Sequence, residues 1–167
     1  NEDETLTFKE LHERVCKFSN VLKKRGVKKG DRVSIYMPMV PELAIAMLAC
    51  ARIGAVHSIV FGGFSADALA DRIVDATCTT VLTCDGIYRG AKPVVMKPLV
   101  DEAMITAEKE MGQPVSTCIV VQHHSENDAF ECPMKEGRDF DYSTLMAEAS
   151  DECQPEEMDS EDPLFIL

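Results

Sequence analysis

The stretch "GDRVSIYMPMVPELAIAMLACARIGAVHSIVFGGFSADALADRIVDA", residues 30–76, decides the fold. Strand-like and helix-like runs alternate within it. We expect a strand at 32–37, a deeply buried helix from Pro41 to Gly54, a strand at 56–60, and a helix at 66–76 that Ser65 caps. Because two strands joined through a helix form a right-handed crossover, this order predicts an α/β fold with a mainly parallel sheet and flanking helices.

The same alternation continues on both sides of this stretch. Toward the N-terminus, Thr7 and Glu10 form a capping box before a helix that ends at Gly26. The elements predicted further along are strands at 79–84 and 116–122, a helix at 97–111, a short helix within 141–150 and a last strand at 163–167.

Three connecting segments carry no clear periodicity. Residues 85–96 contain "YRGAKP" and are interpreted as a loop, and 124–139 as a surface excursion. Residues 151–162, "DECQPEEMDSED", hold a run of acids that we interpret as a solvated acidic linker.

Charge and cysteine content exclude several classes of function. The formal net charge of −12 repels phosphate backbones and anionic membranes, so we expect neither a nucleic-acid nor a membrane partner. Any anionic ligand must therefore be held by local positive groups. The seven cysteines form an odd set without C-x-x-C spacing, which indicates reduced thiols and a cytoplasmic location, with a nuclear or mitochondrial one left open.

Both ends of the sequence indicate a longer polypeptide. The chain opens with "NEDETLTFKEL", which leads directly into structure, and it closes on the apolar run "DPLFIL". We expect the 167 residues to be a fragment.

The sequence lacks the common nucleotide-binding and metal-binding motifs. The glycine pair in "GGFSAD" lacks the G-x-G-x-x-G spacing, and there is no G-x-x-x-x-G-K-[ST]. His123, His124 and Cys132 are spaced too irregularly for a metal site, so we expect no metal ligand. His57 lies in an apolar strand and is interpreted as a hydrogen-bonded core residue.

The stretch "IVFGGFS", residues 59–65, places two glycines at the carboxyl end of a predicted strand. Open α/β sheets bind ligands at that edge, although a turn without a ligand fits the spacing equally well. "YRGAK", residues 88–92, follows the next strand and adds two cations. We expect these two strands to be neighbours in the sheet, so that their carboxyl ends meet at one edge. An aromatic ring, bare backbone and positive charge suit a nucleotide that carries phosphate. The residues expected to converge are Phe61, Gly62, Gly63, Arg89 and Lys92.

The stretch quoted first, together with "YRGAK" and "SEDPLFIL", closely resembles the acetyl-coenzyme A synthetase family, the AMP-forming acetate–CoA ligases among adenylate-forming enzymes. The likeness covers most of residues 5–122 and returns at 154–167, but not the excursion at 124–139. It implies that the chain is part of the large N-terminal AMP-binding domain of such an enzyme, with the phosphate loop and the C-terminal domain absent.

The resemblance also implies a two-step reaction. Acetate and ATP give enzyme-bound acetyl-AMP and pyrophosphate with Mg²⁺ assisting, and the acetyl group then passes to the thiol of CoA. Phe61, Gly62 and Gly63 match positions that lie against the CoA adenine, and Arg89 matches an arginine beside the CoA 3′-phosphate. Lys92 stands where bacterial members have a second arginine. No catalytic residue is carried over, so the 167 residues alone are expected to be inactive.

Two alternatives stay open. The parent enzyme could prefer propionate or another short-chain acyl group, because the sequence does not show the acyl pocket. The chain could also be a non-catalytic nucleotide-binding or interaction module, with the acidic run binding a partner.

Overall fold

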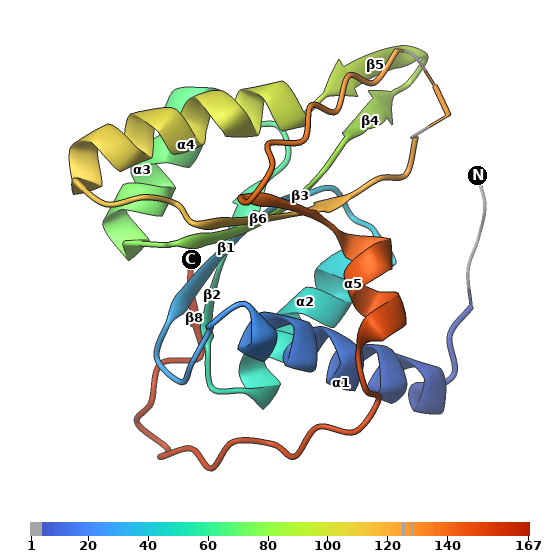
Figure 1. Cartoon of the computed structure of the whole chain (residues 1–167), viewed down its shortest axis with the longest axis vertical. Coiled ribbons are helices and arrows are strands. Elements are labelled where there is room, and N and C mark those ends of the chain that lie inside the picture. The colour runs from blue at the N-terminus through green and yellow to red at the C-terminus, as the bar shows by residue number, and fades with distance from the viewer. Residues whose placement is uncertain (1–4, 125, 128) are drawn as a thin grey trace.

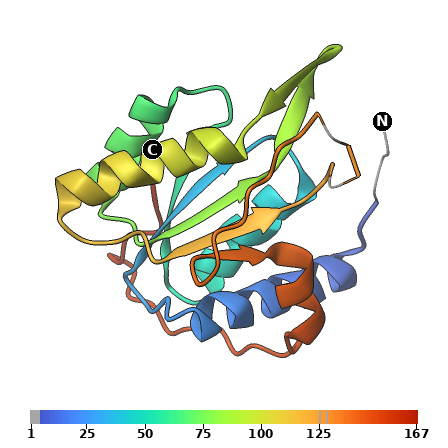
Figure 2. The same cartoon turned by 45° about the horizontal axis from the view of Figure 1, so that its top comes forward.

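A computed structural model describes residues 5–124, 126–127 and 129–167. Figure 1 shows a central sheet with helices on both faces, as predicted. One face carries α1 (Phe8–Lys24), α2 (Pro41–Arg52) and α5 (Tyr142–Glu148). The other carries α3 (Ala66–Ala76) and α4 (Lys97–Met111), which pack against each other (Figure 2).

The main sheet has six strands in the order β7-β6-β3-β1-β2-β8, and every neighbouring pair is parallel. Because helices cover both faces, the central strands are buried along nearly their whole length. This confirms the predicted α/β class. The strand bounds are β1 Arg32–Met37, β2 Val56–Phe61, β3 Thr80–Cys84, β6 Thr117–Val121, β7 Asp139–Asp141 and β8 Phe165–Ile166.

Local capping explains where the helices begin. The Thr7 hydroxyl accepts a hydrogen bond from the N–H of Glu10, whose carboxylate accepts one in return from the Thr7 N–H, so the predicted capping box is present. Pro41 occupies the first turn of α2, and the Ser65 hydroxyl accepts from Ala68 N–H at the start of α3. These starts were predicted because each depends on residues within one turn.

Residues 85–96 were predicted as a loop, and this prediction is wrong. They form a separate antiparallel hairpin of β4 (Gly86–Arg89) and β5 (Lys92–Val95), which projects beyond the main sheet (Figure 1). Gly90 sits in its two-residue turn with φ of +61°, a left-handed conformation that glycine adopts without strain.

The excursion at 124–139 is mostly exposed but differs from the expectation at two points. Phe130 is only 6% exposed, and Asp139 is buried as the first residue of β7. A strand of three residues gives too short a pattern to be recognised from sequence.

The acidic segment 151–162 is also largely exposed, yet it is held to the helices above it. Arg52 Nε donates to the Cys153 carbonyl at 2.8 Å, and Glu156 N–H donates to the Arg52 carbonyl at 2.8 Å. Lys29 Nζ lies 2.9 Å from an Asp162 carboxylate oxygen. The segment thereby leads from α5 to β8, which pairs with β2 as the expected last strand.

Candidate functional site

The carboxyl ends of β1 and β2 form the floor of the candidate site. Met37 and Phe61, the last residues of the two strands, are partners in the parallel register. The chain then turns tightly, since the N–H groups of Gly63 and Phe64 both donate to the Phe61 carbonyl, at 2.7 and 3.0 Å. The Phe61 side chain remains 66% exposed, and its ring meets that of Phe64 edge-on with centroids 6.3 Å apart.

The β4–β5 hairpin brings the two cations to the same edge by an unpredicted route. Neighbouring ends of β2 and β3 were expected to converge, but β1 lies between these strands. Arg89 instead reaches across from the hairpin that follows β3. Arg89 and Lys92 are directly paired across the hairpin, so their side chains share one face, and both residues are exposed.

The Arg89 side chain contacts the turn formed by Gly62 and Gly63, which we call the glycine turn. A methyl group placed on Gly63 would lie 2.2 Å from Arg89 Nη2 and 3.0 Å from Phe61 Cε1. The guanidinium therefore rests on side-chain-free backbone beside the aromatic ring. Among the described residues no carboxylate lies within ion-pair distance of Arg89 or Lys92, so both charges are available to an anion.

Gly62 has a different reason to lack a side chain. It is buried, and a methyl group there would lie 3.3 Å from the carbonyl carbon and oxygen of Met37 and from Met96 Cε. Its small size lets the turn pack against the end of β1. Gly63 is the exposed glycine of the pair.

Tyr36 supports the glycine turn through a hydrogen bond, and the sequence analysis did not identify it. It is fully buried in β1, and its hydroxyl donates to the Phe64 carbonyl at 2.8 Å. Burial raises the pKa of Tyr36 while the nearby Arg89 charge acts against this, so the phenol stays protonated and remains a donor. The one signal in the sequence is a polar tip within a buried strand, which needs a partner.

A buried ion network at the base of the hairpin was also missed. Lys97 is fully buried at the start of α4, and its Nζ lies 2.7 Å from Asp101 and 2.8 Å from Asp139. Arg138 pairs with both carboxylates. Burial opposes the charge on Lys97, but the hydrogen bonds to Asp101 and Asp139 outweigh it and raise its pKa. The i, i+4 spacing of Lys97 and Asp101 was the available sequence signal.

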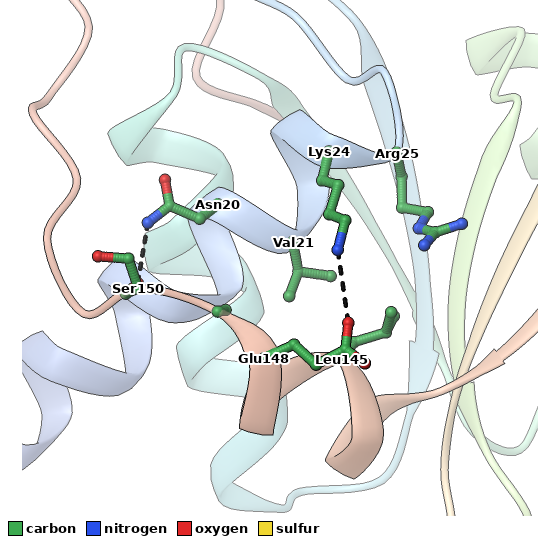
Figure 3. Close-up of a pocket in the computed structure, with 8 residues that line it drawn as sticks. Asn20, Val21, Lys24, Arg25, Leu145, Glu148 and Ser150 are labelled. Carbon is green, nitrogen blue, oxygen red and sulfur yellow. Dashed lines mark hydrogen bonds and ion pairs between the residues drawn. The ribbon is translucent and has the colours of Figure 1, made fainter.

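Two cavities lie away from this edge. One, of about 160 Å³, separates α1 from α5 (Figure 3). Lys24 Nζ reaches Glu148 there at 3.4 Å, and Asn20 Nδ2 donates to the Ser150 carbonyl at 2.8 Å. The other, of about 280 Å³, lies at the opposite edge of the sheet, near the amino ends of β1 and β2. Neither of these two cavities is lined by Phe61, Gly63 or Arg89.

His57 was predicted to be a hydrogen-bonded core residue, and the structure places it in the core. It is buried in β2 with its ring 5.7 Å from that of Phe165, and its Nδ1 has no hydrogen-bond partner among the described residues. Burial lowers the pKa of His57, which keeps the ring neutral.

The described residues contain no group of three or more His, Cys, Asp or Glu side chains that could hold a metal ion. Within the same residues, no helix has the length and apolar character needed to cross a membrane.

Comparison with known proteins shows similarity to acetyl-coenzyme A synthetases. An acetyl-coenzyme A synthetase of Desulfatibacillum aliphaticivorans is 59% identical over 165 residues, covering 99% of this chain. Those of Magnetococcus marinus and Drosophila melanogaster are 55% and 52% identical over 99% and 97% of the chain. These alignments extend through 124–139, which the sequence resemblance had left out. The chain spans about a quarter of the length of these relatives, 24%, 24% and 25%.

The family model described as AMP-binding enzyme matches residues 1–167, the whole chain. The chain therefore belongs to the AMP-binding enzyme family.

Proposed function

We propose that this chain is part of the large N-terminal domain of an AMP-forming acetate–CoA ligase. In this proposal the complete enzyme joins acetate to ATP, giving acetyl-AMP and pyrophosphate, and then transfers the acetyl group to the CoA thiol with release of AMP. The high identity to acetyl-coenzyme A synthetases along almost the whole chain supports it. A cytoplasmic location is proposed from the seven unpaired cysteines.

The contribution of this chain is to bind the nucleotide end of CoA. The observation that carries this proposal is the guanidinium of Arg89 resting on Gly63 beside the exposed ring of Phe61. An adenine can stack on the ring, and the planar guanidinium can hold the 3′-phosphate through two parallel hydrogen bonds. Lys92 adds a point charge on the same face, without the fork geometry of a second arginine.

Electrostatics supports binding of an anion at this place. The chain as a whole carries a formal charge of −12 and repels a polyanion such as CoA unless cations are concentrated locally. Arg89 and Lys92 are exposed, lie on one face, and have no carboxylate partner among the described residues. Two unpaired cations on one face give the 3′-phosphate a local attraction.

We assign no acid, base, nucleophile or metal ligand of the reaction to this chain. Mg²⁺ would act with ATP in the complete enzyme, but the described residues hold no cluster suited to it. The role proposed here is binding and orientation of CoA.

Two alternatives make different predictions. A ligase for propionate or another short-chain acid would share this CoA surface, so the acyl preference of the full-length protein separates it from an acetate ligase. An interaction module would use the acidic segment as a partner-binding tail. That segment forms an ion pair with Lys29 and a hydrogen bond with Arg52, so it is not a free tail.

Replacing Arg89 with alanine in the full-length enzyme tests the proposal. Loss of one charge-assisted contact, about 1.5–3 kcal/mol, should raise the KM for CoA roughly 10- to 150-fold. Acetate-dependent ATP–pyrophosphate exchange should barely change, because it precedes CoA binding. Lys109→Ala removes a cation at the far end of α4 and serves as the control. A shift in acetate or ATP dependence in Arg89→Ala would place the arginine elsewhere.

A further inference from the structure

The hairpin that carries Arg89 and Lys92 stands outside the main sheet and needs support to hold these cations in place. Only two strands of four residues form it, and a two-stranded hairpin is marginally stable by itself. Its base is fixed by Asp85, whose carbonyl accepts from Met96 N–H at 2.8 Å and whose side chain accepts from Gly86 N–H at 2.8 Å. The outer part of the hairpin requires other contacts.

Those contacts come from the segment that follows β6. In both views this orange segment runs beside the hairpin (Figure 1, Figure 2). Phe130 lies directly on the hairpin, since a methyl group on Gly86 would be 2.3 Å from its Cδ1. The Phe130 ring also meets Tyr88 edge-on, with centroids 5.0 Å apart. We call Tyr88, His124, Asn127 and Phe130 the aromatic brace.

The remaining members of the aromatic brace secure Phe130 and Tyr88. The His124 ring stacks on Phe130 with centroids 4.2 Å apart, and His124 N–H donates to the Asp85 carboxylate at 2.6 Å. Asn127 Nδ2 donates to the Tyr88 hydroxyl at 2.7 Å. A buried aromatic ring in an otherwise exposed segment is therefore explained by its contact with the hairpin and not by the main core.

The two faces of the hairpin divide these roles. Side chains alternate along a strand, so Gly86 and Tyr88 face Phe130 while Ile87 and Arg89 face the other way. Ile87 packs on the main core and Arg89 rests on Gly63. Contact with the aromatic brace on one face therefore holds the cations toward the glycine turn on the other.

We propose that Phe130, through the aromatic brace, is a positioning residue that sets the affinity of the enzyme for the nucleotide end of CoA. This inference rests on the proposed function, because the ligand of Arg89 is taken to be the CoA 3′-phosphate. In this inference the segment around residue 130 affects the transfer of the acetyl group to CoA without touching CoA itself.

Limited trypsin digestion of the full-length enzyme tests the positioning directly. The Arg89–Gly90 bond at the hairpin tip is a cleavage site, whereas Lys92 precedes a proline and is resistant. Phe130→Ala should accelerate the appearance of the new N-terminus at Gly90 by about fivefold or more, because cleavage follows the population of the opened hairpin. Phe130→Leu, which keeps most of the apolar volume, should remain near the wild-type rate.

Steady-state kinetics on the same variants supplies the functional measurement. Phe130→Ala should raise the KM for CoA roughly three- to tenfold, less than loss of Arg89 itself, and leave ATP–pyrophosphate exchange within about twofold of wild type. Phe8→Ala removes the same side chain from a position that is 92% exposed and should change neither measurement.

The outcomes separate the two hypotheses. If Phe130→Ala changes neither cleavage nor the KM for CoA while Arg89→Ala raises that KM, the positioning role is wrong and the CoA surface stands. If cleavage accelerates but neither Phe130→Ala nor Arg89→Ala affects CoA, the proposed function itself fails. An equal loss of pyrophosphate exchange in Phe130→Ala would make Phe130 a general support of the fold and overturn the inference.

Discussion

At the scale of single residues, the two adjacent glycines have separate purposes. Gly62 is buried against the end of β1 and Met96, whereas Gly63 is exposed and carries the guanidinium of Arg89. The aromatic ring, the glycines and the arginine could be selected from the sequence by their chemistry. The distinction between the glycines could not, because it depends on Met96 and Arg89, which are distant in the chain and brought close by the hairpin.

A methyl group at position 63 should therefore disturb CoA binding through Arg89. The backbone of Gly63 lacks the positive φ that would strain alanine, so the cost in Gly63→Ala arises from the contact with Arg89 Nη2 at 2.2 Å. We expect the KM for CoA in the full-length enzyme to rise roughly five- to tenfold.

A double-mutant cycle checks the mechanism of that effect. If alanine at position 63 acts by displacing Arg89, it should add little to the effect of Arg89→Ala, because the two residues are in contact. Additive effects of the two substitutions would show that Gly63 serves CoA independently of Arg89.

At the scale of helices and strands, the elements within 30–76 could be predicted closely because their signals are local. Pro41 and Ser65 fix helix starts within one turn, and β-branched runs mark the buried strands. The hairpin and β7 could not be predicted in this way. Their strands are three or four residues long and are stabilised by distant partners such as Phe130 and Lys97, which leave no periodic pattern.

The pairing of β7 with the start of α4 should depend on the charge of Asp139. Burial acts to raise its pKa, but hydrogen bonds from Arg138, Lys135 N–H and Lys97 outweigh this and lower it. A carboxylate with a lowered pKa in the folded state stabilises the fold fully above its unfolded pKa of about 3.9, and this contribution disappears as the pH falls through the folded pKa.

Asp139→Asn should therefore lower the free energy of unfolding at pH 7 by about 3 kcal/mol, since it leaves Lys97 buried without this partner. Its stability should also fall less steeply than that of wild type as the pH drops below about 4. Urea unfolding of the full-length enzyme at several pH values measures both, with the exposed Asp71→Asn as control. Equal acid sensitivity in wild type and Asp139→Asn would contradict this role of the network.

At the scale of the whole molecule, the fold brings the exposed ring of Phe61, Gly63 and Arg89 together at one edge of a parallel sheet. The α/β class and this edge could be predicted, because alternating strands and helices allow few arrangements. The strand order could not, and β1 lies between the two strands expected to be neighbours. Convergence of Phe61 and Arg89 depends on the hairpin crossing that distance, which sequence spacing does not reveal.

The most direct test of the central claim compares CoA with 3′-dephospho-CoA as acetyl acceptors for the full-length enzyme and its Arg89→Ala variant. Wild type should show a KM for 3′-dephospho-CoA roughly tenfold or more above that for CoA, reflecting the charge-assisted contact to the missing phosphate. In Arg89→Ala this ratio should fall toward one. A ratio that stays at its wild-type value in Arg89→Ala would contradict the assignment of this edge to the nucleotide end of CoA.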